Sequence, residues 1–272
     1  MNKFRIGKNW LYVPLIAMAV FYLIPMYVIL ATGFKSFAEV DLKTMWNLPH
    51  GIAFDNYIEA FKHLAPSLKN SFIMVIPAAL ISSMLGSLNG FVLAKWKFRG
   101  ADIIFPFILF GMFIPYQSII IPLVQFMNVI GIKGLAGLAM AHIIYGIPIT
   151  TLTFRNYYAS LPQELLEAAK IDGADMLGVY RHILLPISIP SFVVVLIWQF
   201  TSAWNDFLFA VILTGNTDWP ITVALNNMAG SQIIAWNVQM AGSLLAALPT
   251  LLVYIFLGRY FLRGLLAGSL KG

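Results

Sequence analysis

The chain has 272 residues, of which 60% are hydrophobic and only 10% are charged. Soluble domains carry about 25% charged residues, so this composition excludes an ordinary soluble protein and indicates an all-α, polytopic membrane protein in contact with membrane lipid. Cysteine is absent, which excludes a disulfide framework, a thiol nucleophile and a cysteine-based metal site.

A transmembrane helix needs about 20 mostly apolar residues, and six segments of the chain meet this requirement. They cover residues 11–31, 71–94, 103–127, 135–154, 187–213 and 240–262, and we expect them to form a single transmembrane domain over residues 1–272. The first apolar run has no small-residue cleavage site, so we expect a retained span and not a signal peptide. Prolines inside the spans predict kinks or breaks; they are Pro25, Pro77, Pro115, Pro148 and Pro249.

The distribution of basic residues between the loops predicts the orientation of the chain. Twelve of the seventeen lie on the side that includes both termini: Lys3, Arg5, Lys8, Lys95, Lys97, Arg99, Arg155, Lys170, Arg181, Arg259, Arg263 and Lys271. The positive-inside rule therefore places both termini, the loop 95–102 and the segment 160–186 in the cytoplasm. This topological role accounts for most of the net charge of +6, so we expect no nucleic-acid partner.

Two longer segments are expected on the external side. Residues 34–70 mix acidic residues with lysines, and this loop either meets an external protein or is a solvated connection with a short helix near residues 56–64. Residues 214–239 contain Trp219, Trp236 and no Lys or Arg. Their aromatic and amide groups suit either contact with a neutral polar molecule or anchoring at the membrane interface.

Two ionisable residues lie well inside predicted spans, and such residues are functional candidates. One is His142, which suits packing or a role in transport. The other is Asp206 in the sequence Trp204-Asn205-Asp206-Phe207. These residues either line a substrate pathway, with Asp206 accepting hydrogen bonds from hydroxyl groups, or have a structural role, in which Asp206 caps a broken helix or binds the backbone of a neighbouring subunit. Because no Lys or Arg lies deep in a span, the sequence favours a neutral substrate.

No catalytic or metal-ligating constellation is present in the sequence. The zinc-protease, nucleophile-elbow and phosphate-binding-loop motifs are all missing, and no pair of carboxylates is clustered in the spans. We therefore predict no catalytic residue, no metal site and no cofactor in this chain. Any energy for transport comes from a partner or from an ion gradient.

The predicted cytoplasmic segment 160–186 is the longest water-compatible stretch between two spans. Ser160 and Gln163 form a candidate capping box for a first helix, and Gly173 suits the left-handed turn that ends it. Asp175 then caps a second helix, which Pro186 is expected to stop. The segment therefore predicts a helix, a glycine corner and a second helix.

The spacing of this segment resembles the EAA loop of the membrane subunits of ABC importers. Glu167-Ala168-Ala169, Gly173 and Ile183-Leu184-Leu185-Pro186 fill the pattern. Over its full length the chain is similar to the second, six-span subunit of carbohydrate importers of the maltose-permease type. The further matching pieces are Phe34-Lys35-Ser36, Phe54-Asp55-Asn56-Tyr57, Asn70-Ser71, Ile121-Pro122-Leu123, Trp204-Asn205-Asp206-Phe207-Leu208, Arg263-Gly264-Leu265, Gly268 and Lys271-Gly272.

The resemblance implies a function and a set of partners. The chain would be a multi-pass subunit of a prokaryotic cytoplasmic (inner) membrane that translocates a mono- or oligosaccharide by alternating access. It would pair with a homologous second permease subunit, two ATP-binding cassette subunits that bind ATP and Mg, and an extracytoplasmic sugar-binding protein. Coupling to the ATPases is assigned to Glu167, Ala168, Ala169, Asp172, Gly173 and Pro186, with the C-terminal residues Gly268, Lys271 and Gly272 as a second contact.

Other functions stay open at this point. An importer of the same type for glycerol-3-phosphate or another polar solute is the nearest alternative. A stand-alone proton-coupled transporter would use Asp206 and His142 as a relay, and a membrane-embedded enzyme is disfavoured because the sequence offers no catalytic constellation.

Overall fold

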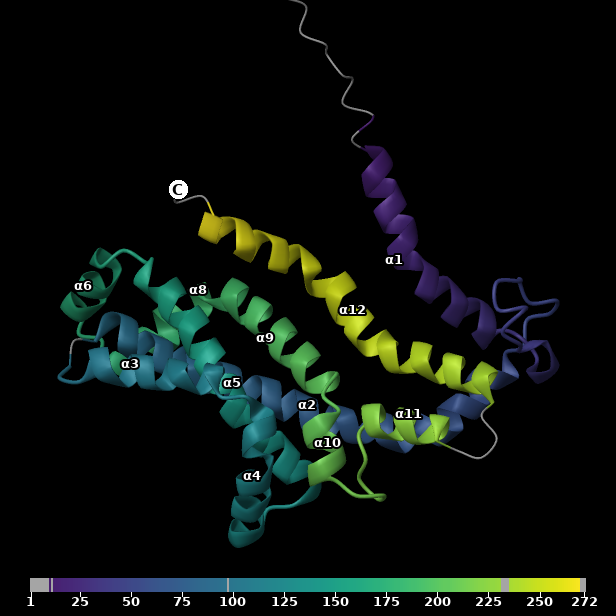
Figure 1. Ribbon diagram of the computed structural model, residues 1–272. Coiled ribbons are helices and arrows are strands. Elements are labelled where there is room, and N and C mark those ends of the chain that lie inside the picture. The colour runs from purple at the N-terminus through teal and green to yellow at the C-terminus, as the bar shows by residue number, and fades with distance from the viewer. Residues whose placement is uncertain (1–9, 11, 97, 231–234, 270–272) are drawn as a thin grey trace, which may run out of the picture. The chain divides into compact units, whose positions relative to one another are not determined.

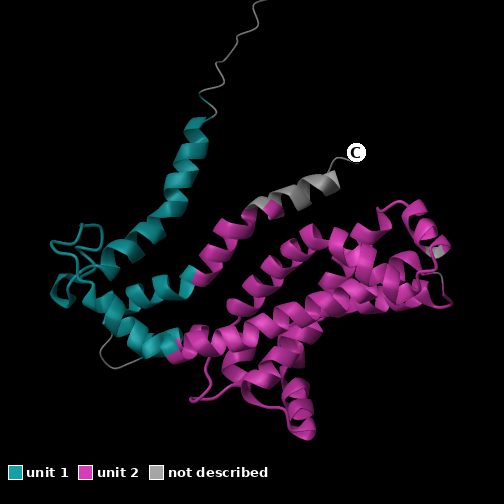
Figure 2. Cartoon of the chain, turned by 180° about the vertical axis from the view of Figure 1, so that it is seen from behind, with its two compact units in different colours: residues 1–65, 225–248 teal, residues 66–224, 249–272 magenta. Residues whose placement is uncertain are grey.

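The computed structural model describes residues 10, 12–96, 98–230 and 235–269, and its regular secondary structure in these ranges is helical throughout (Figure 1). The predicted all-α fold is confirmed. Two compact units are present: residues 1–65 with 225–248, and residues 66–224 with 249–272 (Figure 2). The long helices α2 (Asp55–Lys95) and α12 (Trp236–Ser269) each contribute to both units, so the single transmembrane domain stays a prediction.

Four described helices are long and apolar enough to cross a membrane by themselves. These are α1 (Tyr12–Gly33), α2, α5 (Gly134–Ala159) and the part of α12 over residues 236–258. Two further candidates are bent pairs. If each bent pair counts as one span, the described chain has six candidate spans, the number that the sequence predicts.

The first bent pair covers the predicted span 103–127, and it breaks next to Pro115, where the sequence predicts a kink or a break. Helix α3 (Ala101–Phe110) and the 3₁₀ turn η3 (Gly111–Phe113) are followed by α4 (Tyr116–Ile130), with an angle of 101° at the break. Pro115 is extended, with φ −60° and ψ 121°, and stands at the N-terminus of α4. A proline is tolerated there because the first helical N–H groups have no intrahelical partner.

The second bent pair joins the predicted cytoplasmic segment to the fifth predicted span. Helices α7 (Met176–Val179) and α8 (Leu185–Ile187) are linked through the π-helix η4 (Tyr180–Leu184), and this stretch meets α9 (Ile189–Trp204) at 75°. The chain then breaks again before α10 (Leu208–Leu213), and α11 (Ile221–Ala229) follows.

Helix α2 begins earlier than the predicted span 71–94. The short helix expected near residues 56–64 exists, but it continues through Pro66 and Pro77 as one helix of 41 residues. Asn56, in its first turn, is buried and donates through Nδ2 to the carbonyls of Gly33 (2.9 Å) and Lys35 (2.8 Å). These bonds fix the start of α2 against the chain that leaves α1.

In the first unit, the start of α2 packs on the start of α12 through small side chains. Ala60 and Ala241 are fully buried, and Val238 packs beside them. Asn237 donates from Nδ2 to Oδ1 of Asn56 at 2.8 Å, and both side chains are buried. A buried amide pair of this kind fixes the register of the two helices, because a shift would leave both groups without a partner.

In the second unit, α2 and α5 approach closely at two glycines. A Cβ on Gly86 would lie 2.0 Å from Oγ1 of Thr150, and one on Gly90 would lie 2.6 Å from the backbone nitrogen of Arg155. The Oγ1 of Thr150 also donates to the carbonyl of Ser82 at 3.0 Å. Small residues one turn apart allow such backbone contact between helices in membranes.

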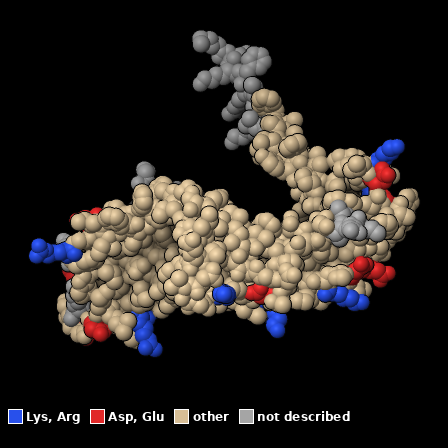
Figure 3. Space-filling view, turned by 60° about the horizontal axis from the view of Figure 1, so that its bottom comes forward, with Lys and Arg blue, Asp and Glu red and all other residues tan. Residues whose placement is uncertain are grey.

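Helix α1 differs from the closely packed helices α2 and α5, because its apolar residues are not buried within the chain. Large side chains such as Phe21 and Tyr22 are about 70% exposed. The face drawn in Figure 3 is likewise mostly neither basic nor acidic. Apolar surfaces of this extent suit lipid or the apolar face of another protein.

We predict that Gly90→Ala destabilises the second unit. The added methyl group would clash with the backbone of α5, which can move away only if the whole helix shifts. The overpacking should therefore lower the free energy of unfolding by about 1–3 kcal/mol. Thermal unfolding of the purified protein in detergent measures the effect. Gly258→Ala, where the added Cβ meets nothing within 4 Å, is the matched control; equal melting of the two variants would contradict the close-contact account.

Candidate functional site

The segment 160–186 contains the predicted helix, glycine corner and second helix. Helix α6 (Glu164–Ile171) is followed two residues later by Gly173, which has φ +83°. The N–H of Ala174 donates back to the carbonyl of Ala169 at 2.9 Å, the bond expected of a Schellman motif. Asp175 then accepts from the N–H of Gly178 at 2.8 Å and caps α7. The predicted corner and the predicted second cap are confirmed.

Two other local predictions are wrong. The Ser160 hydroxyl donates to the carbonyl of Tyr157 at 2.7 Å, so it satisfies the end of α5 and does not cap α6. Pro186 does not stop the second helix, which continues to Ile187. The N–H of Leu185 donates to the carbonyl of Tyr180, five residues earlier, so the backbone widens into a π turn just before the proline that cannot donate.

The two faces of this segment differ in exposure. Glu167, Ala168, Asp172 and Gly173 are exposed, as are Ile171 (86%) and Leu177 (65%), and together they form a surface that we call the knob. Ala169 is only 5% exposed and belongs to the core below, so its side chain is not part of the knob. That core joins α6 and η4 to α2, α5 and α9; its buried members are Phe91, Phe154, Tyr158, Leu166, Ala169, Val179, Tyr180, Leu184 and Val195.

The second predicted site lies at the break between α9 and α10. Trp204 is only 2% exposed and stacks on Phe200, with ring centroids 5.4 Å apart, so its ring is part of the packing. Asn205 is exposed and donates to the carbonyl of Thr201 at 3.0 Å. Asp206 accepts from the N–H of Ala210 at 3.0 Å and thereby caps α10. The structure therefore gives Asp206 the capping role that the sequence left open.

Asp206 also faces His142 of α5. The distance from its Oδ2 to Nε2 of His142 is 3.5 Å, and both side chains are nearly buried. Phe209 lies against His142, Tyr116 and Tyr145, with ring centroids 5.4–6.0 Å apart. A carboxylate, an imidazole and two phenols beside aromatic rings can hydrogen-bond and stack on a sugar.

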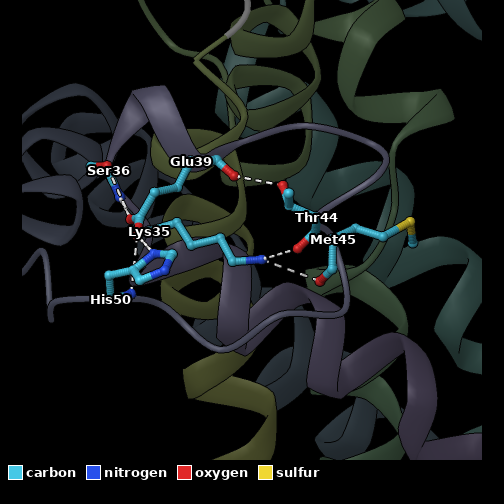
Figure 4. Close-up of polar contacts among 6 residues, drawn as sticks. All are labelled: Lys35, Ser36, Glu39, Thr44, Met45 and His50. Carbon is cyan, nitrogen blue, oxygen red and sulfur yellow. Dashed lines mark hydrogen bonds and ion pairs between the residues drawn. The ribbon is translucent and has the colours of Figure 1, made fainter.

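The loop that follows α1, which the sequence predicts to be external, is held together by hydrogen bonds between its own polar groups (Figure 4). The ammonium group of Lys35 is buried and donates to the carbonyls of Thr44 (2.8 Å) and Met45 (3.3 Å). Glu39 accepts from the backbone N–H groups of Ser36 (2.8 Å) and His50 (3.0 Å) and contacts the His50 ring. Chiefly the Ser36 N–H, and then the His50 groups, lower the pKa of Glu39 to about 2.

The remaining predicted positions add little to either site. Gly268 lies in the last turns of α12, whereas Lys271 and Gly272 fall outside the described residues. Within the described residues no group of three or more His, Asp or Glu could hold a metal ion. Sequence reasoning missed the buried hydroxyls of Ser87, Tyr158, Tyr180 and Ser188, because isolated polar residues in apolar runs carry no motif.

The chain matches a known protein family and is similar in sequence to several transport proteins. Residues 86–266 match the model of the binding-protein-dependent transport system inner membrane component family. A probable ABC transporter permease of Pyrococcus horikoshii is 47% identical over all of both chains. The xylose/arabinose import permease of Haloferax volcanii is 37% identical over 90% of this chain and 87% of its own. The glucose import system permease of Saccharolobus solfataricus is 33% identical over 96% and 95%.

Two solved structures share the fold. A chain of a bacterial ABC transporter that imports the acidic polysaccharide alginate aligns with a TM-score of 0.79 at 21% identity, over 96% of this chain and 99% of its own. A chain of an alginate transporter solved with an alginate-bound periplasmic protein aligns with a TM-score of 0.69 at 16% identity, over 92% and 93%.

The lowered pKa of Glu39 predicts how the loop that follows α1 responds to acid. Because the folded-state pKa lies below the ordinary value of 4.5, the stabilisation by Glu39 is fully present above about pH 4.5 and is lost as pH falls through about 2. Cleavage of the loop by pepsin, normalised to an unfolded substrate, should therefore stay slow at pH 4 and rise toward pH 2.

Glu39→Gln should expose the loop to pepsin throughout this pH range, and Glu59→Gln, on the exposed face of α2, is the control. A loop that is cut equally fast with Glu39 and with Gln at pH 4 would refute the role of this carboxylate.

The capping role of Asp206 predicts an order of stabilities. Asp206→Asn keeps an oxygen that accepts from Ala210, whereas Asp206→Ala removes the cap, which should cost about 1 kcal/mol more. Hydrogen exchange of the amides of α10 measures the difference. Equal protection of α10 in the two variants would show that the cap contributes nothing.

Proposed function

Because the chain belongs to the binding-protein-dependent transport system inner membrane component family, we propose that it is a permease subunit of a sugar-importing ABC transporter. Relatives named as xylose/arabinose and glucose import permeases, similar over nearly the whole chain, support sugars as the substrate class. The observation that carries the proposal is the knob, an exposed rigid projection on a chain whose described helices include four to six candidate spans.

The proposed assembly contains this chain, a homologous second permease subunit, two ATPase subunits and an extracytoplasmic sugar-binding protein. The similar alginate transporter was solved with a periplasmic protein, which supports the last of these partners. The exposed apolar face of α1 suits contact with a large apolar neighbour, such as the second permease subunit, or with lipid. ATP and Mg would bind to the ATPase subunits, and this chain would take no part in the hydrolysis.

The knob is proposed to dock on an ATPase subunit. Glu167 and Asp172 offer carboxylates to basic groups, and Ile171 and Leu177 offer apolar side chains at the same surface. These exposed side chains stand on the core through which α6 and η4 pack against α2, α5 and α9. An interior packed like this transmits displacement because it deforms little. Closure of the ATPases would thus move the helices and alternate access to the substrate.

The candidate substrate-pathway group is Asp206 with His142, Tyr116 and Tyr145. Its groups can donate and accept hydrogen bonds with a substrate. Among the residues that the structure describes, no Lys or Arg nitrogen lies within 4 Å of the Asp206 carboxylate, which favours a neutral sugar over glycerol-3-phosphate. Trp204 is proposed to support this group by packing, since its ring is buried, and exposed Asn205 stays a candidate contact.

A second candidate function is proton-coupled transport by this chain alone. The single observation in its favour is the 3.5 Å approach of Asp206 and His142. Such a transporter would work without an ATPase, and Asp206→Asn would abolish uptake driven by a pH gradient.

We predict that Gly173→Asp weakens binding of the ATPase subunits. Aspartate disfavours the φ of +83° that the corner requires and adds charge to the knob. Tagged chain purified from native membranes in mild detergent should bring down an ATPase and a second permease, and the variant should retain less than about a fifth of the ATPase, as expected for roughly 1–2 kcal/mol.

The matched control is Gly51→Asp, in the external loop, where an added Cβ meets nothing within 4 Å and φ is ordinary. If neither the wild type nor the control brings down an ATPase or a second permease, the ABC-importer proposal is overturned. Proton-coupled transport is then the function to test.

A further inference from the structure

Four buried hydroxyl groups form a connected chain beneath the knob. The Oη of Tyr180 lies 3.0 Å from Oγ of Ser87, which lies 2.7 Å from Oη of Tyr158, which lies 3.1 Å from Oγ of Ser188. Ser188 in turn donates to the carbonyl of Leu185 at 2.9 Å. We call these four residues the hydroxyl chain. Ser87, Tyr158 and Ser188 are completely buried, and Tyr180 is 5% exposed.

The direction of every bond in the hydroxyl chain follows from counting protons. Each hydroxyl has one proton to donate. Ser188 uses its proton on the Leu185 carbonyl, so Tyr158 donates to Ser188, Ser87 donates to Tyr158 and Tyr180 donates to Ser87. No proton is left over and each bond has one donor. A chain satisfied in this way is rigid, because removing any member leaves a buried polar neighbour without its partner.

The chain begins and ends on the same segment. Tyr180 and Leu185 bracket the π-helix η4, while Ser87 belongs to α2 and Tyr158 to α5. Ser188 stands at the 75° bend where this segment meets α9. The ring of Phe91 stacks on Tyr180, with centroids 5.7 Å apart, and holds the phenol in place. Helices α2 and α5 and the bend before α9 are therefore connected by hydrogen bonds to the segment that contains the knob.

We propose that the hydroxyl chain makes α2, α5 and the α8–α9 bend move together with the knob. Ser87, Tyr158, Tyr180 and Ser188 are thus positioning residues for transport. The inference rests on the proposed function, in which an ATPase displaces the knob. Without the hydroxyl chain, that displacement would be absorbed by the π turn and by the bend at Ser188. ATP would then be hydrolysed with less movement of the spans.

The test uses the complete importer in proteoliposomes, with this chain, the second permease, both ATPase subunits and the binding protein. Uptake of radiolabelled glucose and xylose is measured against ATP hydrolysed in the same vesicles. Ser87→Ala removes the central hydroxyl, and we expect the ratio of sugar imported to ATP hydrolysed to fall about fivefold or more, the effect of roughly 1 kcal/mol on an equilibrium. Hydrolysis itself should continue.

Ser83→Ala is the matched control. Ser83 lies one turn earlier on α2, is completely buried, and its hydroxyl has no hydrogen-bond partner among the described residues. It should keep the wild-type ratio. Tyr180→Phe removes only the bond from Tyr180 to Ser87, keeps the stacked ring and should also lower the ratio of sugar imported to ATP hydrolysed. This variant tests the inference if the Ser87 variant fails to assemble. The double variant should be no worse than Ser87→Ala alone.

The outcomes separate the two proposals. If wild-type complexes couple uptake to hydrolysis and both Ser87→Ala and Tyr180→Phe keep that ratio, the hydroxyl chain has no positioning role and the importer function stands. If Ser83→Ala lowers the ratio as much as Ser87→Ala, loss of any buried hydroxyl suffices and the inference is overturned. If wild-type protein neither binds ATPase subunits nor stimulates hydrolysis with sugar, the proposed function fails and the inference fails with it.

Discussion

A buried peptide group without a hydrogen-bond partner is costly, and this constraint explains the contacts made at two places where the helices of the protein depart from regularity. At the break after α9, the Asp206 carboxylate satisfies an N–H of α10, and the hydroxyl of Thr222 donates to the Asp206 carbonyl at 2.7 Å. Before Pro186 the backbone widens so that the Leu185 N–H reaches Tyr180. Each of these two irregularities therefore has its own hydrogen-bond partners, and each lies beside a candidate functional element.

Helix α6 has one exposed face, which belongs to the knob, and one buried face. Glu167 and Ala168 are exposed, whereas Ala169, the next residue, is part of a core that reaches α2, α5 and α9. One short sequence motif thus contains both an exposed face and its buried support. A helix of only eight residues has little stability by itself, and here it is held by its buried face and by the Schellman turn at Gly173.

Sequence reasoning succeeded where one residue determines the local backbone or where a whole segment shares one property. Gly173 and Asp175 specify a corner and a cap by themselves, and long apolar runs specify helices. It failed where two structures compete for one residue. Ser160 is a good cap for a following helix, but α5 reaches Ala159 and takes its hydroxyl. Pro186 should end a helix, but a π turn accommodates it. Tyr158 and Ser87 are 71 positions apart, so their bond follows only from tertiary packing.

The contrast between Ala168 and Ala169 also makes the chain a convenient spectroscopic reporter. The natural sequence contains no cysteine, so a single Ala168→Cys substitution supplies a unique thiol on the exposed face without any prior replacement. A probe attached there senses arrival of a protein at the knob, whereas a small thiol-reactive probe directed at Ala169→Cys reacts only when the underlying core opens. Two neighbouring positions therefore distinguish binding from loosening of the core within one cycle of transport.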